Sequence, residues 1–213
     1  MSDSSEAPQP DSDSNAVGAT PTVRLREETA ELHREVEQSI DWSYYLRDAH
    51  RYAKFLRQIS TFLPAADQKI DQLLGKPEPW FKDRRKGKWA LEDLQLLTDQ
   101  SETEILHKIA DSAKSITGMS YAWVQTPQDA AGVLYVLEGS TMGAMHLCKS
   151  VSRNIPFAPV GYLAAYGDQT PSRWKTTKAW LDQFLVEPHH VGQAVQAAKQ
   201  MFLFYREQLG GPS

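Results

Sequence analysis

Residues 126–153 read TPQDAAGVLYVLEGSTMGAMHLCKSVSR, and this stretch decides the fold class. Thr126 offers a capping hydroxyl, Pro127 occupies the first helical position, and the acid Asp129 follows two residues later. This combination is a strong signal for the start of a helix, because it suits the backbone N–H groups that a first turn leaves free. We therefore expect a long helix that ends near Arg153.

Further helices are predicted downstream of this stretch. Thr170-Pro171 opens a helix in the same way, and Pro188 starts a last helix that stops at Gly210-Gly211. The positions of these two helices that we expect to face inward are Trp174, Leu181, Phe184, Leu185, Val191, Val195, Ala198, Phe202 and Tyr205.

Helices are also predicted upstream. From Thr22, inward-facing residues recur at spacings of three and four, which is typical of an amphipathic helix and predicts one that ends near Ser39. A second helical stretch starts after Asp48 as its cap, is kinked or divided by Pro64, and stops at Gly75.

Two more candidate helices cover 88–97 and 101–116, and no alternating period-two segment of useful length occurs, so the expected fold class is all-α. A length of 213 residues fits one domain, or at most two. The hydrophobic share of 41%, with six Trp, eight Tyr and seven Phe, is sufficient for a sizeable core. Residues 1–21 are rich in Ser, Asp, Pro, Ala and Gly, which predicts a disordered N-terminal tail before a single helical domain at 22–213.

Charge and apolar patterning exclude several classes of partner. The formal net charge of −4 and the pI of about 5.9 give no overall reason to expect nucleic acid or an anionic membrane as a partner. The chain has neither the features of a signal peptide nor an apolar run of about 18 residues, so we expect no membrane insertion. Cys148 is the single cysteine and cannot form an internal disulfide, which favours a reducing compartment and a cytoplasmic protein.

His33 borders the apolar stripe of the first predicted helix, in line with Thr29 and Val36. Glu37 follows one turn later, where a carboxylate can accept the second ring N–H of a metal-bound imidazole and fix its tautomer. Arg26 lies seven residues earlier, about 10 Å along a helix, which is close to the distance from a haem iron to its propionates. This face offers a ligand, its orienting acid and a cation. The alternative is a boundary histidine paired with a glutamate on a solvated helix edge.

Gly139 and Gly143 lie four residues apart inside the long predicted helix. Each costs about 1 kcal/mol of helix stability relative to Ala, so a pair on one face invites an explanation. Such a pair exposes bare backbone, against which a flat ligand can lie closely, and also permits a local kink. The alternative is close helix packing through small residues, and the local sequence leaves both interpretations open.

Lys175 and Lys178 flank Trp174 near a helix start. They are either solvated or placed to close over anionic groups at the rim of a pocket. The basic cluster at 84–88 is too small to indicate nucleic-acid binding, but it is compatible with docking of an acidic redox protein.

Two further pairs are weak signals for a metal. Glu104 and His107 supply half of the ligand set of a di-iron bundle, a set that also requires a second such pair and further carboxylates. His146 and Cys148 lie two residues apart on one helix, which is poor geometry for one metal ion.

Taken together, these features resemble the haem oxygenase family, especially its bacterial members and those found beside bacterial phytochromes. The resemblance covers nearly all of 22–209. Residues 25–37, LREETAELHREVE, are similar to the family's proximal helix, in which a histidine ligates the iron. Residues 135–143, YVLEGSTMG, are similar to its distal helix and form the most specific match. Tyr166-Gly167, with Thr170 and Trp174, is similar to the stretch leading into the helix that helps to hold the propionates.

The resemblance implies a multi-helical bundle with haem b between a proximal and a distal helix. It makes His33 the axial iron ligand and Glu37 the acid that orients it. The implied propionate contacts and rim cations are Arg26, Tyr135, Lys175 and Lys178. The implied residues at the distal face of the haem are Gly139, Ser140 and Gly143, with Ser140 near the water network on the oxygen side.

Two positions depart from the family's pattern. Mammalian-type members carry an acid where this chain has Ser140, so the ordering of distal water must differ. Many relatives have a second glycine where this chain has Ala144, although alanine is similar to what some bacterial members show.

The implied reaction is cleavage of haem to biliverdin, carbon monoxide and ferrous iron, with O2 and with electrons from a separate reductase or ferredoxin. Haem is then both cofactor and substrate, so the residues required are a neutral histidine ligand, a tight distal helix and ordered water. A bacterial phytochrome is an implied receiver of the biliverdin. The alternatives are a haem carrier or a haem-free interaction protein on the same fold, and a di-iron oxidase of similar helical architecture.

Overall fold

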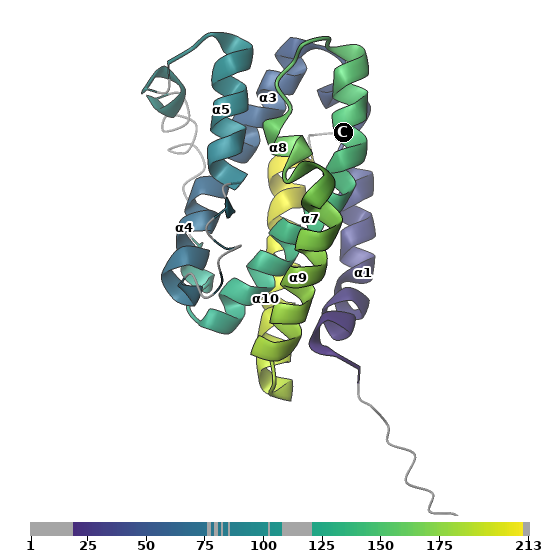
Figure 1. The fold of residues 1–213 in the computed structure, drawn as a ribbon, viewed down its shortest axis with the longest axis vertical. Helices are drawn as coiled ribbons and strands as arrows, with labels where there is room; N and C mark the ends of the chain where they lie inside the picture. The colour runs from purple at the N-terminus through teal and green to yellow at the C-terminus, as the bar shows by residue number, and fades with distance from the viewer. Residues whose placement is uncertain are drawn as a thin grey trace, which may run out of the picture.

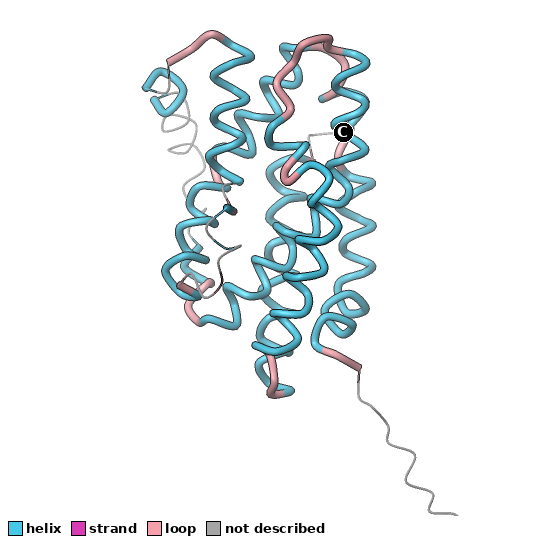
Figure 2. Tube along the Cα trace, viewed as in Figure 1, coloured by secondary structure: helices cyan, strands magenta, loops and turns pink. Residues whose placement is uncertain are grey.

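The computed structural model describes residues 19–75, 78, 81, 83–84, 86–101, 103–107 and 121–210. This part of the chain is helical and contains no strand (Figure 2), which confirms the all-α expectation. The elements are α1 (Pro21–Ser39), α2 (Trp42–Tyr45), α3 (Ala49–Ser60), α4 (Leu63–Leu74), α5 (Lys86–Thr98), η2 (Tyr121–Trp123), α7 (Pro127–Asn154), α8 (Gly161–Ala164), η3 (Gly167–Gln169), α9 (Thr170–Phe184) and α10 (Pro188–Leu209).

Local signals start and stop the helices where the sequence predicts. Thr126 and Asp129 form a reciprocal capping box at the start of α7, because each side chain accepts the other residue's backbone N–H, at 3.1 and 3.0 Å. The Asp48 carboxylate likewise accepts the Arg51 N–H at 3.0 Å and caps α3. Gly75, at a φ of 67°, ends α4.

Two details differ from the expectations, and parts of two others lie outside the described residues. Thr170 is the buried first residue of α9 and its hydroxyl does not cap the helix. The turn η3 leads into α9 with Gln169 in a helical conformation, whereas a capping side chain needs an extended residue at that position. The short helix α2 was not predicted. Of the helix expected at 101–116, the structure shows 103–107 as helical, and most of the rest lies outside the described residues, as do 1–18 of the expected tail.

Helix α10 occupies the middle of the bundle and packs against α7 and α1, while α9 covers α7 (Figure 1). Gly132 marks the crossing of α7 and α10, because a Cβ atom there would lie 2.1 Å from the Ala194 carbonyl oxygen. Only glycine permits so close an approach of the two backbones. The sequence pattern did not single out this residue.

Helices α1 and α7 run in the same direction. Tyr135 of α7 is hydrogen-bonded to Thr29 of α1, and further along both segments Asn154 donates a hydrogen bond to the Leu46 carbonyl at 2.9 Å. The two contacts follow each other in the same order along both segments. None of the described helices is long and apolar enough to cross a lipid bilayer.

Candidate functional site

A cavity of about 780 Å³ lies between α1 and α7. This volume is within the range usual for small-molecule and cofactor pockets, about 300–1,000 Å³. Aromatic and aliphatic side chains from α3, α8 and α10 also line it, namely Phe55, Tyr162, Leu163, Phe202, Tyr205 and Leu209. The shape and lining suit a ligand that is largely apolar.

His33 lines this cavity from α1. The residues Leu25, Thr29 and Val36 bury the inner face of α1, and His33 lies one turn beyond Thr29 at the edge of that face. Its side chain is 51% exposed, and its ring centroid lies 5.3 Å from that of Phe202 on α10. Packing on Phe202 holds the ring beside the cavity and leaves it open to a ligand.

Glu37 lies beside His33, with its Oε1 atom 3.4 Å from the Nε2 atom of the imidazole. The pairing follows from the i,i+4 spacing that the sequence shows. An acid in this position accepts a ring N–H and leaves the other ring nitrogen free to bind a metal.

Arg26, Thr29 and Tyr135 meet at one end of the cavity. Burial raises the pKa of Tyr135, while the hydrogen bond with Thr29 and the charge of Arg26 oppose that rise. Arg24, on the same helix, is bound to Glu28 at 2.9 Å, whereas Arg26 has no ion-pair partner among the described residues. This end of the cavity therefore presents a cation beside a phenol, a combination that suits a carboxylate.

Gly143 faces the cavity with bare backbone. A Cβ atom at this position would have no described heavy atom within 4 Å, and one at Gly139 would meet only the Trp174 ring, at the ordinary distance of 3.5 Å. Close helix packing therefore does not explain Gly143, whereas the Trp174 ring of α9 packs beside Gly139 at van der Waals distance. The glycine of α7 that packing does require is Gly132.

Ser140 also lines the cavity, and its hydroxyl donates to the Leu137 carbonyl at 2.8 Å. Thr141 does the same to Glu138, at 2.6 Å. The hydroxyls of two successive residues thus donate to backbone carbonyls three residues earlier, in a segment that also contains two glycines. Hydrogen bonds of this kind weaken and bend a helix.

The lysines of α9 lie apart from the cavity wall. Trp174 lines the cavity, with its ring centroid 5.5 Å from that of Tyr135 and the two rings tilted by 53°, but neither Lys175 nor Lys178 is among the lining residues. Lys175 is exposed, and the Lys178 ammonium lies 5.7 Å from the centre of the Trp174 ring. The structure therefore brings the predicted residues of α1 and α7 together and leaves these two lysines outside.

His146 is a cavity residue that the sequence reasoning missed. That reasoning considered His146 only as a partner of Cys148. The spacing between His146 and the two glycines could have identified it as a cavity residue. His146 follows Gly143 by three residues and Gly139 by seven, which places all three on one helix face.

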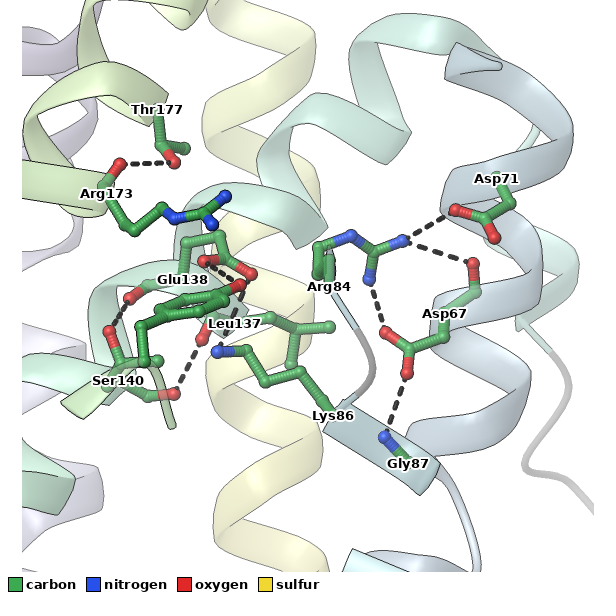
Figure 3. Close-up of polar contacts among 12 residues, drawn as sticks. Asp67, Asp71, Arg84, Lys86, Gly87, Leu137, Glu138, Ser140, Arg173 and Thr177 are labelled. Atoms are coloured by element: carbon green, nitrogen blue, oxygen red, sulfur yellow. Dashed lines mark hydrogen bonds and ion pairs between the residues drawn. The ribbon is translucent and has the colours of Figure 1, made fainter. Parts of the chain in front are cut away.

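Two members of the basic cluster at 84–88 are buried, which corrects the docking hypothesis for them, while the Lys88 side chain is 66% exposed. The side chains of Arg84 and Lys86 are 0% and 3% exposed, and both are paired with acids inside the protein (Figure 3). Glu104 and His107 are exposed, and the described residues contain no group of three or more side chains placed to hold a metal ion.

Comparisons with known proteins agree with this arrangement. The sequence matches the family described as "Heme oxygenase" over residues 20–210. No curated protein matches the sequence. The solved heme oxygenase of Leptospira interrogans is similar in fold, with a TM-score of 0.65 and 16% identity over 90% of this chain and 99% of that one. The NO- and CO-bound heme oxygenase of Neisseria meningitidis gives a TM-score of 0.64 and 22% identity, over 90% of this chain and 91% of that one. Because the family match spans the whole helical domain, the chain belongs to the haem oxygenase family.

Proposed function

We propose that this protein cleaves haem b, with O2 and supplied electrons, to biliverdin, carbon monoxide and ferrous iron. One observation carries the proposal. His33 of α1 and the bare backbone of Gly143 on α7 line the same cavity, and space is open at Gly143. A histidine on one side and an unobstructed helix on the other match what a flat, iron-containing substrate requires.

When bound, haem supplies both the iron that activates dioxygen and the ring that is oxidised. His33 would hold the iron, with the Glu37 carboxylate beside its imidazole. Glu37 keeps the imidazole oriented and raises its basicity by accepting the other N–H. Phe202 supports the ring by its contact at 5.3 Å.

Arg26 and Tyr135 bind the propionates at their end of the cavity. A hydrogen bond to a charged group contributes about 1.5–3 kcal/mol when buried and less when exposed, so we assign Arg26, which is exposed, the lower part of this range. Lys175 and Lys178 add positive charge outside the cavity wall, which is a weaker role than the sequence resemblance implies.

Gly139 and Gly143 let the α7 backbone lie close to the haem face. A side chain at Gly143 would enter open space at the cavity wall, where it would compete with bound haem for room. The Ser140 hydroxyl, next to Gly139 at the same wall, can hold water there.

A separate reductase or ferredoxin supplies the electrons in this proposal, and Arg84 and Lys86 are too deeply buried to form part of its docking surface. A bacterial phytochrome is the proposed receiver of biliverdin. The single Cys148 is compatible with activity in the cytoplasm.

The test is to titrate haemin into the purified protein, supply electrons in air, and follow the spectrum. We expect a saturable Soret band that disappears on reduction while biliverdin absorbance grows. A Soret band that persists would indicate a haem carrier instead. Without any Soret band, the protein would be a haem-free member of the family.

A further inference from the structure

Glu138 is a buried acid on the side of α7 that faces away from the cavity. Its side chain is 1% exposed, its Oε2 atom accepts a hydrogen bond from the Tyr166 hydroxyl at 3.0 Å, and its Oε1 atom lies 3.5 Å from the Lys86 ammonium (Figure 3). Lys86 is 3% exposed and lies 5.0 Å from the centre of the Tyr166 ring. Three separate segments of the chain therefore meet at one carboxylate.

Lys86 is itself held in place by its neighbours. Arg84 is fully buried and binds Asp67 and Asp71 of α4, and the second oxygen of Asp67 accepts the Gly87 N–H at 2.8 Å. A Cβ atom at Gly87 would lie 2.6 Å from a backbone nitrogen of α4, so this segment rests directly on that helix. The contacts of Glu138 thus connect α7 to a rigid support.

The ion pair does not add obvious stability. Neither Lys86 Nζ nor Glu138 Oε1 has a hydrogen-bond partner among the described residues, and burial lowers the pKa of Lys86 although the Glu138 carboxylate opposes this. Buried pairs of this kind are often replaced by apolar residues without loss of stability, and some are kept because they fix one arrangement among several.

The segment of α7 that follows Glu138 needs such support. It contains Gly139 and Gly143, and the hydroxyls of Ser140 and Thr141 bond to carbonyls three residues back, so its own helix is weak. Successive residues of a helix point about 100° apart, so the direction of Glu138 sets the direction of Gly139. A rotation of α7 that moved the glycines would pull Glu138 from Lys86 and Tyr166.

We propose that Glu138, held by Lys86 and Tyr166, is a positioning residue that fixes the rotation of α7 and so aims Gly139 and Gly143 at bound haem. This inference rests on the proposed function, since it assigns how the distal wall of the same site is held. The pair would then decide which edge of the haem is attacked rather than whether haem binds.

The test compares three variants in the full chain. The double change Lys86→Met with Glu138→Leu removes both charges together. It fills the same buried space with apolar side chains of similar size. Tyr166→Phe removes the hydrogen bond alone. Leu94→Ala is the control, because Leu94 is fully buried in α5 and does not line the cavity, so it lowers stability elsewhere. The readouts are melting temperature, Soret spectrum, the stretching frequency of carbon monoxide on the ferrous haem complex, and the biliverdin isomer ratio.

For the double variant we expect a melting temperature near that of wild type and an unchanged Soret band, because His33 is untouched. The carbon monoxide frequency and the isomer ratio should change, and turnover should fall about tenfold, because a small misplacement of the reacting groups, even one caused far from the chemistry, slows a reaction. Tyr166→Phe should shift the same readouts less. Leu94→Ala should lower the melting temperature and leave frequency and isomer ratio as in wild type.

A double variant with wild-type frequency and isomer ratio would overturn the inference, since the pair would then serve stability alone. If the double variant does not fold, Tyr166→Phe decides by the same two readouts. Wild-type protein that fails to bind haem would instead refute the proposed function, and this inference with it.

Discussion

Glu37 Oε1 lies 3.4 Å from His33 Nε2, one turn along the same helix, and the two side chains are 61% and 51% exposed. A pair this exposed contributes little to the stability of the fold, about 0–1 kcal/mol. The pair therefore matters for its position beside the cavity and not for its contribution to the stability of the fold. The ring is already oriented before any ligand arrives.

We expect His33→Ala to lose the histidine-type spectrum of the haem complex while keeping the fold, because its exposed side chain contributes little to the core. Glu37→Gln should be milder, since it lowers the basicity of the ligand and keeps its packing. His50→Ala, at an exposed position outside the cavity, is the control. Absorbance and electron paramagnetic resonance spectra check the assignment, and a His33→Ala complex with the wild-type spectrum would refute it.

Arg26→Ala should weaken haem binding about tenfold, or roughly 1.4 kcal/mol, because a charge-assisted contact is lost at a partly solvated end of the cavity. Arg24→Ala is a matched control on the same helix, because Arg24 is bound to Glu28 and does not line the cavity. Fluorescence quenching by haemin measures both affinities. Equal haemin affinities of the two variants would show that Arg26 does not contribute to haem binding.

Buried tyrosines predict how stability changes at high pH. Burial raises the pKa of Tyr162 to about 12 and raises those of Tyr52, Tyr121, Tyr166 and Tyr205 as well. A folded-state pKa above the ordinary value of 10.0 means that the native state keeps protons which the unfolded chain has lost. The free energy of unfolding is therefore unaffected by these groups below pH 10.0 and falls as pH rises further.

The measurement is tyrosinate absorbance against far-ultraviolet circular dichroism during an alkaline titration. We expect the buried tyrosines to ionise together with loss of helix, after the exposed Tyr44. Ionisation of all eight tyrosines near pH 10.0 in a protein that stays helical would contradict the burial described here.

Helix limits were predictable because short local signals set them. The capping box of Thr126 and Asp129, the Asp48 cap and the stop at Gly75 each depend on residues within a few positions of one another. Thr170 shows the limit of such reasoning. Its local sequence looks like that of Thr126, but the turn before it has another conformation, so its hydroxyl does not act as a cap.

Long-range contacts were not predictable in the same way. Arg84 and Lys86 look like surface cations in the sequence, and only the folded chain brings Asp67, Asp71 and Glu138 around them. The three glycines of α7 are also alike in sequence. Whether a glycine serves packing, as Gly132 does, or faces open space, as Gly143 does, depends on which helix lies opposite.

The most direct test of the central claim is haem turnover by Gly143→Leu, measured with its melting temperature and Soret band. Its control is Gly132→Ala, whose added Cβ atom would meet the Ala194 carbonyl oxygen at 2.1 Å and should lower the melting temperature sharply. We predict that Gly143→Leu folds like wild type, binds haem through His33 and no longer makes biliverdin, because the leucine occupies open space beside the haem. Full biliverdin production by Gly143→Leu would contradict the placement of haem against α7.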